Sequence, residues 1–169
     1  MRYAPAALAL SLLAAVTASV SFGAPTATLL DARAAALLAQ GRAALGAGNT
    51  DAAIDAFEAA LTVQPGQVAI YLDLAEATRR QGLQGKALHY YREALEREPN
   101  NPLAIAGEGT TLVEKGAIEK ARLNLVRLKQ LCGGDCAPSR QLAEAIRNGP
   151  APRIVTAEAV QAKPVVTPN

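Results

Sequence analysis

The sequence predicts an all-α fold in which three helical hairpins stack side by side and a further helix covers the end of the stack. The main observation is a repeat: the stretch 53–65 recurs as 87–99, with Ala, an aromatic residue, Leu and Pro at equivalent positions. In addition, Gly48, Gly82 and Gly116 recur with the same period, as a turn with positive φ in every hairpin would require. Such repetition is typical of stacked units, none of which buries its apolar face alone.

The segment 1–23 has the layout of a secretory signal peptide. Arg2 precedes an uncharged apolar run over 4–20, and small residues follow the run. We expect cleavage after Ser21 or Gly23. The alternative is an uncleaved membrane anchor, because the run is barely long enough to span a bilayer. A lead-in over 24–33 follows, in which Thr28 is the expected N-cap of the first helix and Asp31 completes a capping box.

Three hairpins are expected over 34–133, because glycine, asparagine and proline interrupt the helical periodicity at regular places. The units are 34–67, 68–101 and 102–133. The first helix ends at the Gly-rich turn 46–49, and the helices that follow are expected at about 50–63, 68–80, 85–97, 102–115 and 117–130.

A capping helix is expected in the segment 134–148, at about 138–147. It carries Leu142 and Ile146 on one face and charged residues on the other. An open stack leaves its last apolar face exposed, and a lone amphipathic helix covers such a face. The segment 149–169 has four prolines and no helical period, so we expect a disordered tail.

The composition argues against several classes of function. The chain has 17 basic and 15 acidic residues, so its net charge of +2 does not attract the phosphates of nucleic acid. The single histidine, His89, has no obvious second base or nucleophile, and no Gly-rich phosphate loop or paired carboxylates are found. We therefore expect a non-enzymatic protein without metal or cofactor, in which His89 serves in packing or lies on the surface.

The repeated positions resemble the pattern of the tetratricopeptide repeat family. That pattern places a small residue on the first helix of each unit, an Ala and an aromatic residue on the second, and a closing proline. The small positions here hold Gly41, Ala75 and Gly109, and the second helices hold Ala53 with Phe57, Ala87 with Tyr91, and Ala121 with Leu125. The resemblance covers about 34–133. It fails at Gln40 and Glu108, where the family has leucine, and at Gly133, where it has proline.

This resemblance implies a right-handed superhelix whose concave groove, lined by the first helix of each unit, binds a peptide or a partner helix. The groove residues that it implies are Leu38, Arg42, Leu45, Leu72, Glu76, Arg79, Arg80, Ala106, Thr110, Val113 and Glu114. Their leucines and arginines suit an acidic, partly apolar segment, because Arg makes forked contacts with carboxylates. The alternative is that they are ordinary solvated helix positions.

One subclass of the family grips a C-terminal carboxylate with Lys and Asn residues on its first helices. The corresponding face here contains no Asn. Its residues are Leu38, Arg42, Asp73, Leu103 and Gly107. Binding of chaperone tails in this way is therefore disfavoured.

Cys132 and Cys136 are the only cysteines, and they enclose Gly-Gly-Asp. In an exported protein an even number of cysteines predicts a disulfide, which would hold the capping helix against the third hairpin. A loop this short would contribute about 2 kcal/mol. A redox-active thiol pair and a metal site are the alternatives.

Together these features predict a periplasmic or secreted interaction module that acts as an adaptor or assembly factor. Its expected partner is another protein or peptide of the cell envelope, and no membrane insertion is expected after signal cleavage. Two alternatives remain open at this point: a thiol-disulfide accessory protein that uses Cys132 and Cys136, and a self-associating structural protein of the envelope. The sequence does not predict the oligomeric state.

Overall fold

The computed structural model describes residues 30–150, and this part of the chain consists of seven α-helices without a strand. The helices are α1 (Ala32–Gly46), α2 (Thr50–Val63), α3 (Val68–Arg80), α4 (Gln84–Arg97), α5 (Pro102–Glu114), α6 (Ile118–Cys132) and α7 (Ala137–Asn148). These bounds confirm the helices expected from the sequence, except that the first helix begins later than expected. The predicted signal peptide, Thr28 and the tail from residue 151 lie outside the described residues.

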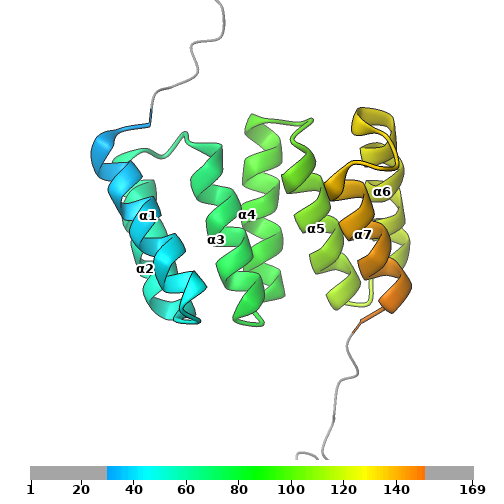
Figure 1. Ribbon diagram of the computed structural model, residues 1–169, viewed down its shortest axis with the longest axis horizontal. Coiled ribbons are helices and arrows are strands. Elements are labelled where there is room, and N and C mark those ends of the chain that lie inside the picture. Colours follow the sequence, from blue (N-terminus) through cyan, green and yellow to red (C-terminus); the bar gives the residue numbers. More distant parts are fainter. Residues whose placement is uncertain (1–29, 151–169) are drawn as a thin grey trace, which may run out of the picture.

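The helices form three antiparallel hairpins that follow one another along a stack (Figure 1). The pairs are α1 with α2, α3 with α4, and α5 with α6, and each hairpin contacts only its neighbours in the stack. The predicted all-α hairpin stack is therefore confirmed. None of the described helices is both long enough and apolar enough to cross a membrane.

Side-chain caps start several of the helices. Asp31 is the N-cap of α1, and its carboxylate accepts hydrogen bonds from the backbone amides of Arg33, at 2.8 Å, and Ala34, at 3.2 Å. The expectation that Thr28 caps this helix is therefore wrong. The helix begins later, since the Asp31 side chain satisfies amides that have no acceptor within the helix. Asn49 and Asn101 cap α2 and α5 in the same way.

The three turns within the hairpins share one backbone conformation. Gly48, Gly82 and Gly116 all have φ of 81°, which is the left-handed region that glycine adopts without strain. The residue after each glycine donates its amide to a carbonyl near the end of the preceding helix, at 2.8–2.9 Å. This is the pattern of a glycine-terminated helix, and it confirms the prediction of a positive φ in every hairpin.

Two aromatic residues occupy equivalent places in neighbouring hairpins. Phe57 of α2 is fully buried and Tyr91 of α4 is 4% exposed. The Phe57 ring lies against Gly41 of α1, where an added Cβ would stand 2.3 Å from its Cε1 atom. Tyr91 packs on Ala75 of α3, which holds the same position in the second hairpin. Small residues on the first helices thus allow close approach of the second helices.

The helix α7 closes the end of the stack. Its Leu142 is fully buried and lies so close to Gly109 of α5 that a Cβ there would be 2.6 Å from the Cδ2 atom of Leu142. The apolar side of α7 also packs against α6. The predicted capping helix is confirmed.

Candidate functional site

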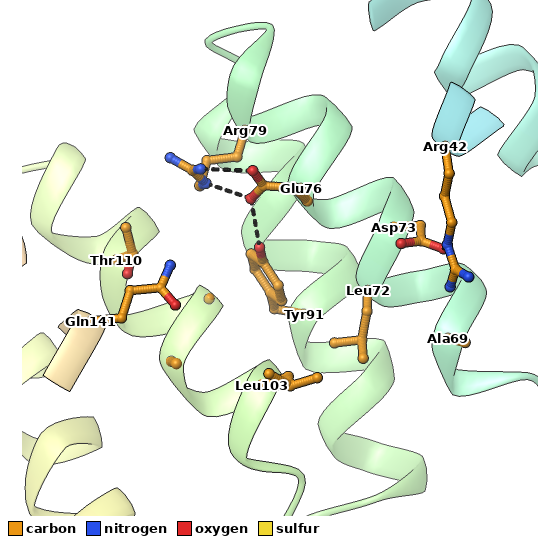
Figure 2. Close-up of a pocket in the computed structure, with 12 residues that line it drawn as sticks. Arg42, Ala69, Leu72, Asp73, Glu76, Arg79, Tyr91, Leu103, Thr110 and Gln141 are labelled. Atoms are coloured by element: carbon orange, nitrogen blue, oxygen red, sulfur yellow. Dashed lines mark hydrogen bonds and ion pairs between the residues drawn. The ribbon is translucent and has the colours of Figure 1, made fainter. Parts of the chain in front are cut away.

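The first helices of the three hairpins, together with α7, line a pocket of about 390 Å³ (Figure 2). It lies on the side of the stack formed by α1, α3 and α5, and one side chain of α4 reaches it from behind. The lining residues are Arg42, Ala69, Leu72, Asp73, Glu76, Arg79, Tyr91, Leu103, Ala106, Gly107, Thr110 and Gln141.

The floor of the pocket depends on Tyr91 and Gly107. The Tyr91 ring passes between α3 and α5 and rests on Gly107, where a Cβ would stand 2.2 Å from the ring. Only glycine leaves this room. The tyrosine hydroxyl reaches toward Glu76, with 3.5 Å between the oxygen atoms (Figure 2). Burial and the neighbouring Glu76 charge raise the pKa of the Tyr91 hydroxyl, so this group stays protonated and can donate a hydrogen bond.

Apolar side chains line one side of the pocket. Leu72 comes from α3 and Leu103 from the first turn of α5, directly after its Pro102. Leu103 is 59% exposed, which is a high value for a leucine beside a pocket. These side chains offer contact area to an apolar group of a ligand.

A network of ion pairs crosses the pocket from α3. Arg79 donates two hydrogen bonds to Glu76, each at 2.9 Å, and also pairs with Glu114 of α5. Arg80 donates to the same Glu76 at 2.7 Å. Burial raises the pKa of Glu76, but hydrogen bonds and charge from the two arginines outweigh it and leave that pKa below its ordinary value. Glu76 is therefore ionised and held in place.

A second ion pair joins α1 to α3 at the other end of the pocket. The Nε atom of Arg42 donates to Asp73 at 2.8 Å. Burial raises the pKa of Asp73 above its ordinary value, and the Arg42 charge opposes this only in part. Arg42 is 57% exposed, so much of its guanidinium remains accessible to a ligand.

Two buried oxygen atoms beside the pocket lack a hydrogen-bond partner among the described residues. They are Oγ1 of Thr110 and Oε2 of Glu114, one turn apart on α5. Buried polar groups are nearly always paired. Of these two residues, Thr110 lines the pocket, where a donor from a bound molecule or from water would satisfy its oxygen.

The fold matches proteins of known structure. The first tetratricopeptide domain of Spaghetti (RPAP3), bound to an HSP90 peptide, superposes with a TM-score of 0.62 at 18% identity, over 69% of this chain and 94% of that chain. The tetratricopeptide domain of Sgt2 from Aspergillus fumigatus superposes with a TM-score of 0.64 at 22% identity, over 70% of this chain and 80% of that chain. The Yersinia enterocolitica chaperone SycD, in complex with a YopD peptide, superposes with a TM-score of 0.61 at 16% identity, over 68% of this chain and 89% of that chain.

The model of the tetratricopeptide repeat family matches residues 38–102 of the sequence. The match covers the first two of the three hairpins. No curated protein matches the chain.

The pocket contains several of the residues that were predicted for the groove of the repeats. These are Arg42, Leu72, Glu76, Arg79, Ala106 and Thr110. Arg80 and Glu114 lie beside the pocket and pair with its residues, whereas Leu45 is half-buried against the first hairpin's core.

Leu38 and Val113 were expected in the groove, and this is wrong. Each is only 2% exposed. Leu38 packs among side chains of α2 and α3, and Val113 among those of α4, α6 and α7. The first helices turn these positions toward the next helices of the stack, so they contribute to the core.

The groove prediction omitted several pocket residues that the repeat itself relates. Ala69 and Leu103 hold equivalent places in successive repeats, and so do Asp73 and Gly107. From the sequence, Asp73, Leu103 and Gly107 were named only on the face that binds a C-terminal carboxylate in one subclass of the family. Extending equivalent positions from repeat to repeat would have placed them in the pocket. Gln141 belongs to the capping helix and has no equivalent position in the repeats, so the repeat does not predict it as a pocket residue.

The charges of the pocket differ from the predicted ones. The arginines were expected to favour an acidic ligand, but Arg42 is paired with Asp73, and Arg79 with Glu76 and Glu114. The lining therefore balances two arginines with two carboxylates. It presents fixed dipoles and apolar surface and has no net positive field.

The cysteines and the histidine lie away from the lining of the pocket. Cys132 ends α6 and Cys136 precedes α7, and their Cα atoms are 5.9 Å apart. This separation lies within the range of disulfide bridges. His89 is exposed on α4 beside Tyr90, with 5.4 Å between the ring centres.

Proposed function

We propose that this protein is an exported, non-enzymatic interaction module that binds a peptide or a partner helix in the pocket between α1, α3 and α5. The observation that carries the proposal is the pocket of about 390 Å³ along the first helices, whose lining combines Leu72 and Leu103 with the Tyr91 ring and paired charges. A concave, partly apolar site with a few oriented polar groups is the usual form of a binding site.

Related folds support this proposal. The Spaghetti domain holds an HSP90 peptide, and SycD holds a peptide of YopD. Both of these domains use the same helical stack as the present chain. Proteins of the family generally act as interaction modules without catalysis.

The pocket favours a ligand with an aliphatic side chain flanked by hydrogen-bonding groups. Leu72 and Leu103 suit the aliphatic group, the exposed side of Arg42 suits an acceptor, and the unpaired oxygen of Thr110 suits a donor. A ligand that depends on two free cations for a terminal carboxylate is not favoured, since Arg79 is already held by two carboxylates of its own.

A crosslinking pull-down from an envelope extract tests the groove. The double variant Leu103→Asp with Arg42→Glu removes apolar contact and reverses the accessible charge. We expect it to lose a captured partner about tenfold or more, because burying one leucine contributes about 1.5–3 kcal/mol. Matched changes outside the pocket, Leu83→Asp with Arg33→Glu, should leave capture unchanged, because both side chains are exposed elsewhere. Equal capture by all three proteins would show that the pocket is not the binding site.

We further infer export to the periplasm or the outside of the cell, a structural Cys132–Cys136 disulfide, and an adaptor or assembly role toward an envelope protein. The signal-like sequence 1–23 and the short Cα separation of the cysteines support the first two. One measurement addresses both: the intact mass of protein recovered from the envelope fraction should match a chain cleaved after Ser21 or Gly23, and reduction should add about two mass units for one disulfide. A full-length mass, or thiols that are free without reductant, would contradict this inference.

A further inference from the structure

Charge is unevenly distributed along the stack. Residues 31–114 carry seven basic and eleven acidic side chains, whereas residues 115–148 carry seven basic and three acidic ones. The net charge of +2 for the whole chain conceals this difference. The helices α6 and α7 lie together at one end of the stack (Figure 1). By these counts that end is positive, and the remainder of the stack is negative.

The outward side of α6 carries two exposed aliphatic residues. Leu123 is 69% exposed and Val126 is 54% exposed, one helical turn apart. Single exposed aliphatic side chains are common on protein surfaces. Two such neighbours on one face of one helix are less common, and the equivalent positions of the other hairpins show whether the fold requires them.

The first two hairpins have positions equivalent to Leu123 and Val126. The positions equivalent to Leu123 are Asp55 in α2 and His89 in α4, and those equivalent to Val126 are Glu58 and Arg92. All four of these side chains are polar and exposed. The fold therefore does not require apolar residues at these positions, and only the third hairpin has them.

Basic residues flank the pair. Arg122 and Lys129 are both exposed, and they replace Ile54 and Leu61 of the first hairpin, which pack against the next helices. A polar outer side is expected where a stack ends, and this accounts for the two basic residues. It does not account for Leu123 and Val126. The guanidinium of Arg122 makes only a long contact with Glu119, at 3.6 Å, so it is available to a partner.

We propose that Arg122, Leu123, Val126 and Lys129 form a second docking surface, the α6 outer face, for an acidic protein segment that presents aliphatic side chains between carboxylates. The positive charge of this end of the stack selects carboxylates, and Arg122 makes forked contacts with them. Leu123 and Val126 receive the aliphatic side chains. The surface is separate from the pocket between the first helices, so it does not depend on the function proposed for that pocket.

A protein segment fits this face better than a membrane does. Membrane-surface helices present a broad apolar face, with aromatic or large aliphatic side chains that enter the lipid. The α6 outer face offers two aliphatic side chains on a helix that is fixed in the stack by Ala121 and Leu128. This area suits a small protein contact and is too small for insertion into lipid.

The test uses the full chain and a labelled synthetic helix that carries leucines on one face with glutamates beside them. Fluorescence anisotropy should show binding that weakens as salt is raised, and a peptide with lysines in place of the glutamates should not bind. Arg122→Glu with Lys129→Glu should weaken binding about tenfold or more, and Leu123→Ser by about tenfold.

Controls separate the α6 outer face from charge in general and from the pocket. Arg33→Glu with Lys86→Glu gives the same change in net charge at exposed sites outside the basic end of the stack, and Leu103→Asp alters the pocket. Both should bind the acidic helix as the wild type does, and circular dichroism should show that every variant is folded. Equal binding by all variants would overturn the proposal. Flotation with vesicles containing phosphatidylglycerol, without binding of the acidic helix, would overturn it in favour of a membrane surface.

Discussion

Single atoms decide how closely the helices of this stack approach. Gly41 faces the fully buried ring of Phe57, and the space for a methyl group at this position is already filled. Cores packed to this density do not accept an added carbon without displacement of a neighbour. Gly46, at the end of the same helix, has open space around it.

The substitution Gly41→Ala is expected to lower the free energy of unfolding by about 1–3 kcal/mol, because the new Cβ overlaps Phe57. Gly46→Ala should leave stability unchanged or raise it by up to about 1 kcal/mol, because alanine favours the helix. Urea unfolding of both variants checks this. If Gly41→Ala is as stable as the wild type, the close contact between Gly41 and Phe57 is not a feature of the folded protein.

Asp73 and Glu76 lie on the same helix, yet their pKa values shift in opposite directions. Glu76 has a lowered pKa in the folded state, so its ionised form stabilises the fold above the ordinary pKa of 4.5. That contribution is lost as the pH falls through the lowered value. Asp73 has a raised pKa, so its ionised form opposes folding near neutral pH, and protonation removes this effect as the pH falls toward the ordinary pKa of 3.8.

Glu76→Gln should therefore be less stable than the wild type at pH 7, with a difference that disappears at low pH. Asp73→Asn should be more stable than the wild type at pH 7, and this difference should also shrink on acidification. Urea midpoints measured from pH 3.5 to pH 7 provide the comparison. Shifts of the same sign in both variants would contradict the assigned environments.

Among the elements, α7 has the clearest structural role. Its Leu142 fills the space above Gly109, and the helix covers both α5 and α6. In a stack each unit contacts only its neighbours, so a defect in the last helix weakens the adjoining hairpin most. The same helix contributes Gln141 to the pocket, which connects the closing of the stack with the shape of the site.

Leu142→Ala should destabilise the protein by about 2–5 kcal/mol, since it removes a fully buried side chain. Amide hydrogen exchange should accelerate in α5, α6 and α7 and change little in α1 and α2. Leu123→Ala, at an exposed leucine of α6, serves as the matched control and should change stability by no more than about 0.5 kcal/mol. Uniform acceleration along the whole chain would mean that the stack unfolds as a single unit.

At the scale of the molecule, the stack separates two surfaces of different chemistry. The pocket between the first helices is balanced in charge, whereas the end at α6 and α7 is basic. The first follows from pairing between arginines and carboxylates of different helices, and the second from an uneven distribution along the chain. A repeat architecture permits both, because its faces vary independently while the core positions stay the same.

Most of the fold could be predicted before the structure was known. The regular period of the repeat and the three turn glycines predict the hairpins, and the amphipathic pattern around Leu142 predicts the closing helix. Residues such as Phe57 and Tyr91 identify the core because they recur at the same position. Turn residues and helical periodicity predict the hairpins because the two helices of each hairpin are adjacent in the sequence.

The candidate site could be predicted only in part. Arg42 and Arg79, which were predicted for the groove, line the pocket, but no sequence pattern indicated that Asp73, Glu76 and Glu114 would neutralise them. Likewise, Leu38 and Val113 share a helical face with groove residues, yet neighbouring helices bury them. Helical periodicity gives the direction of a side chain to within part of a turn, and this is too coarse to separate a groove position from a core position beside it.

The order of residues alone thus determines the number of hairpins, their turns and the small positions at which they approach one another, because each of these depends on contacts within one unit. Which polar groups pair, which leucines remain accessible and where a pocket opens depend on the angle at which successive hairpins pack. That angle results from contacts between residues far apart in the chain, so only the assembled stack decides it.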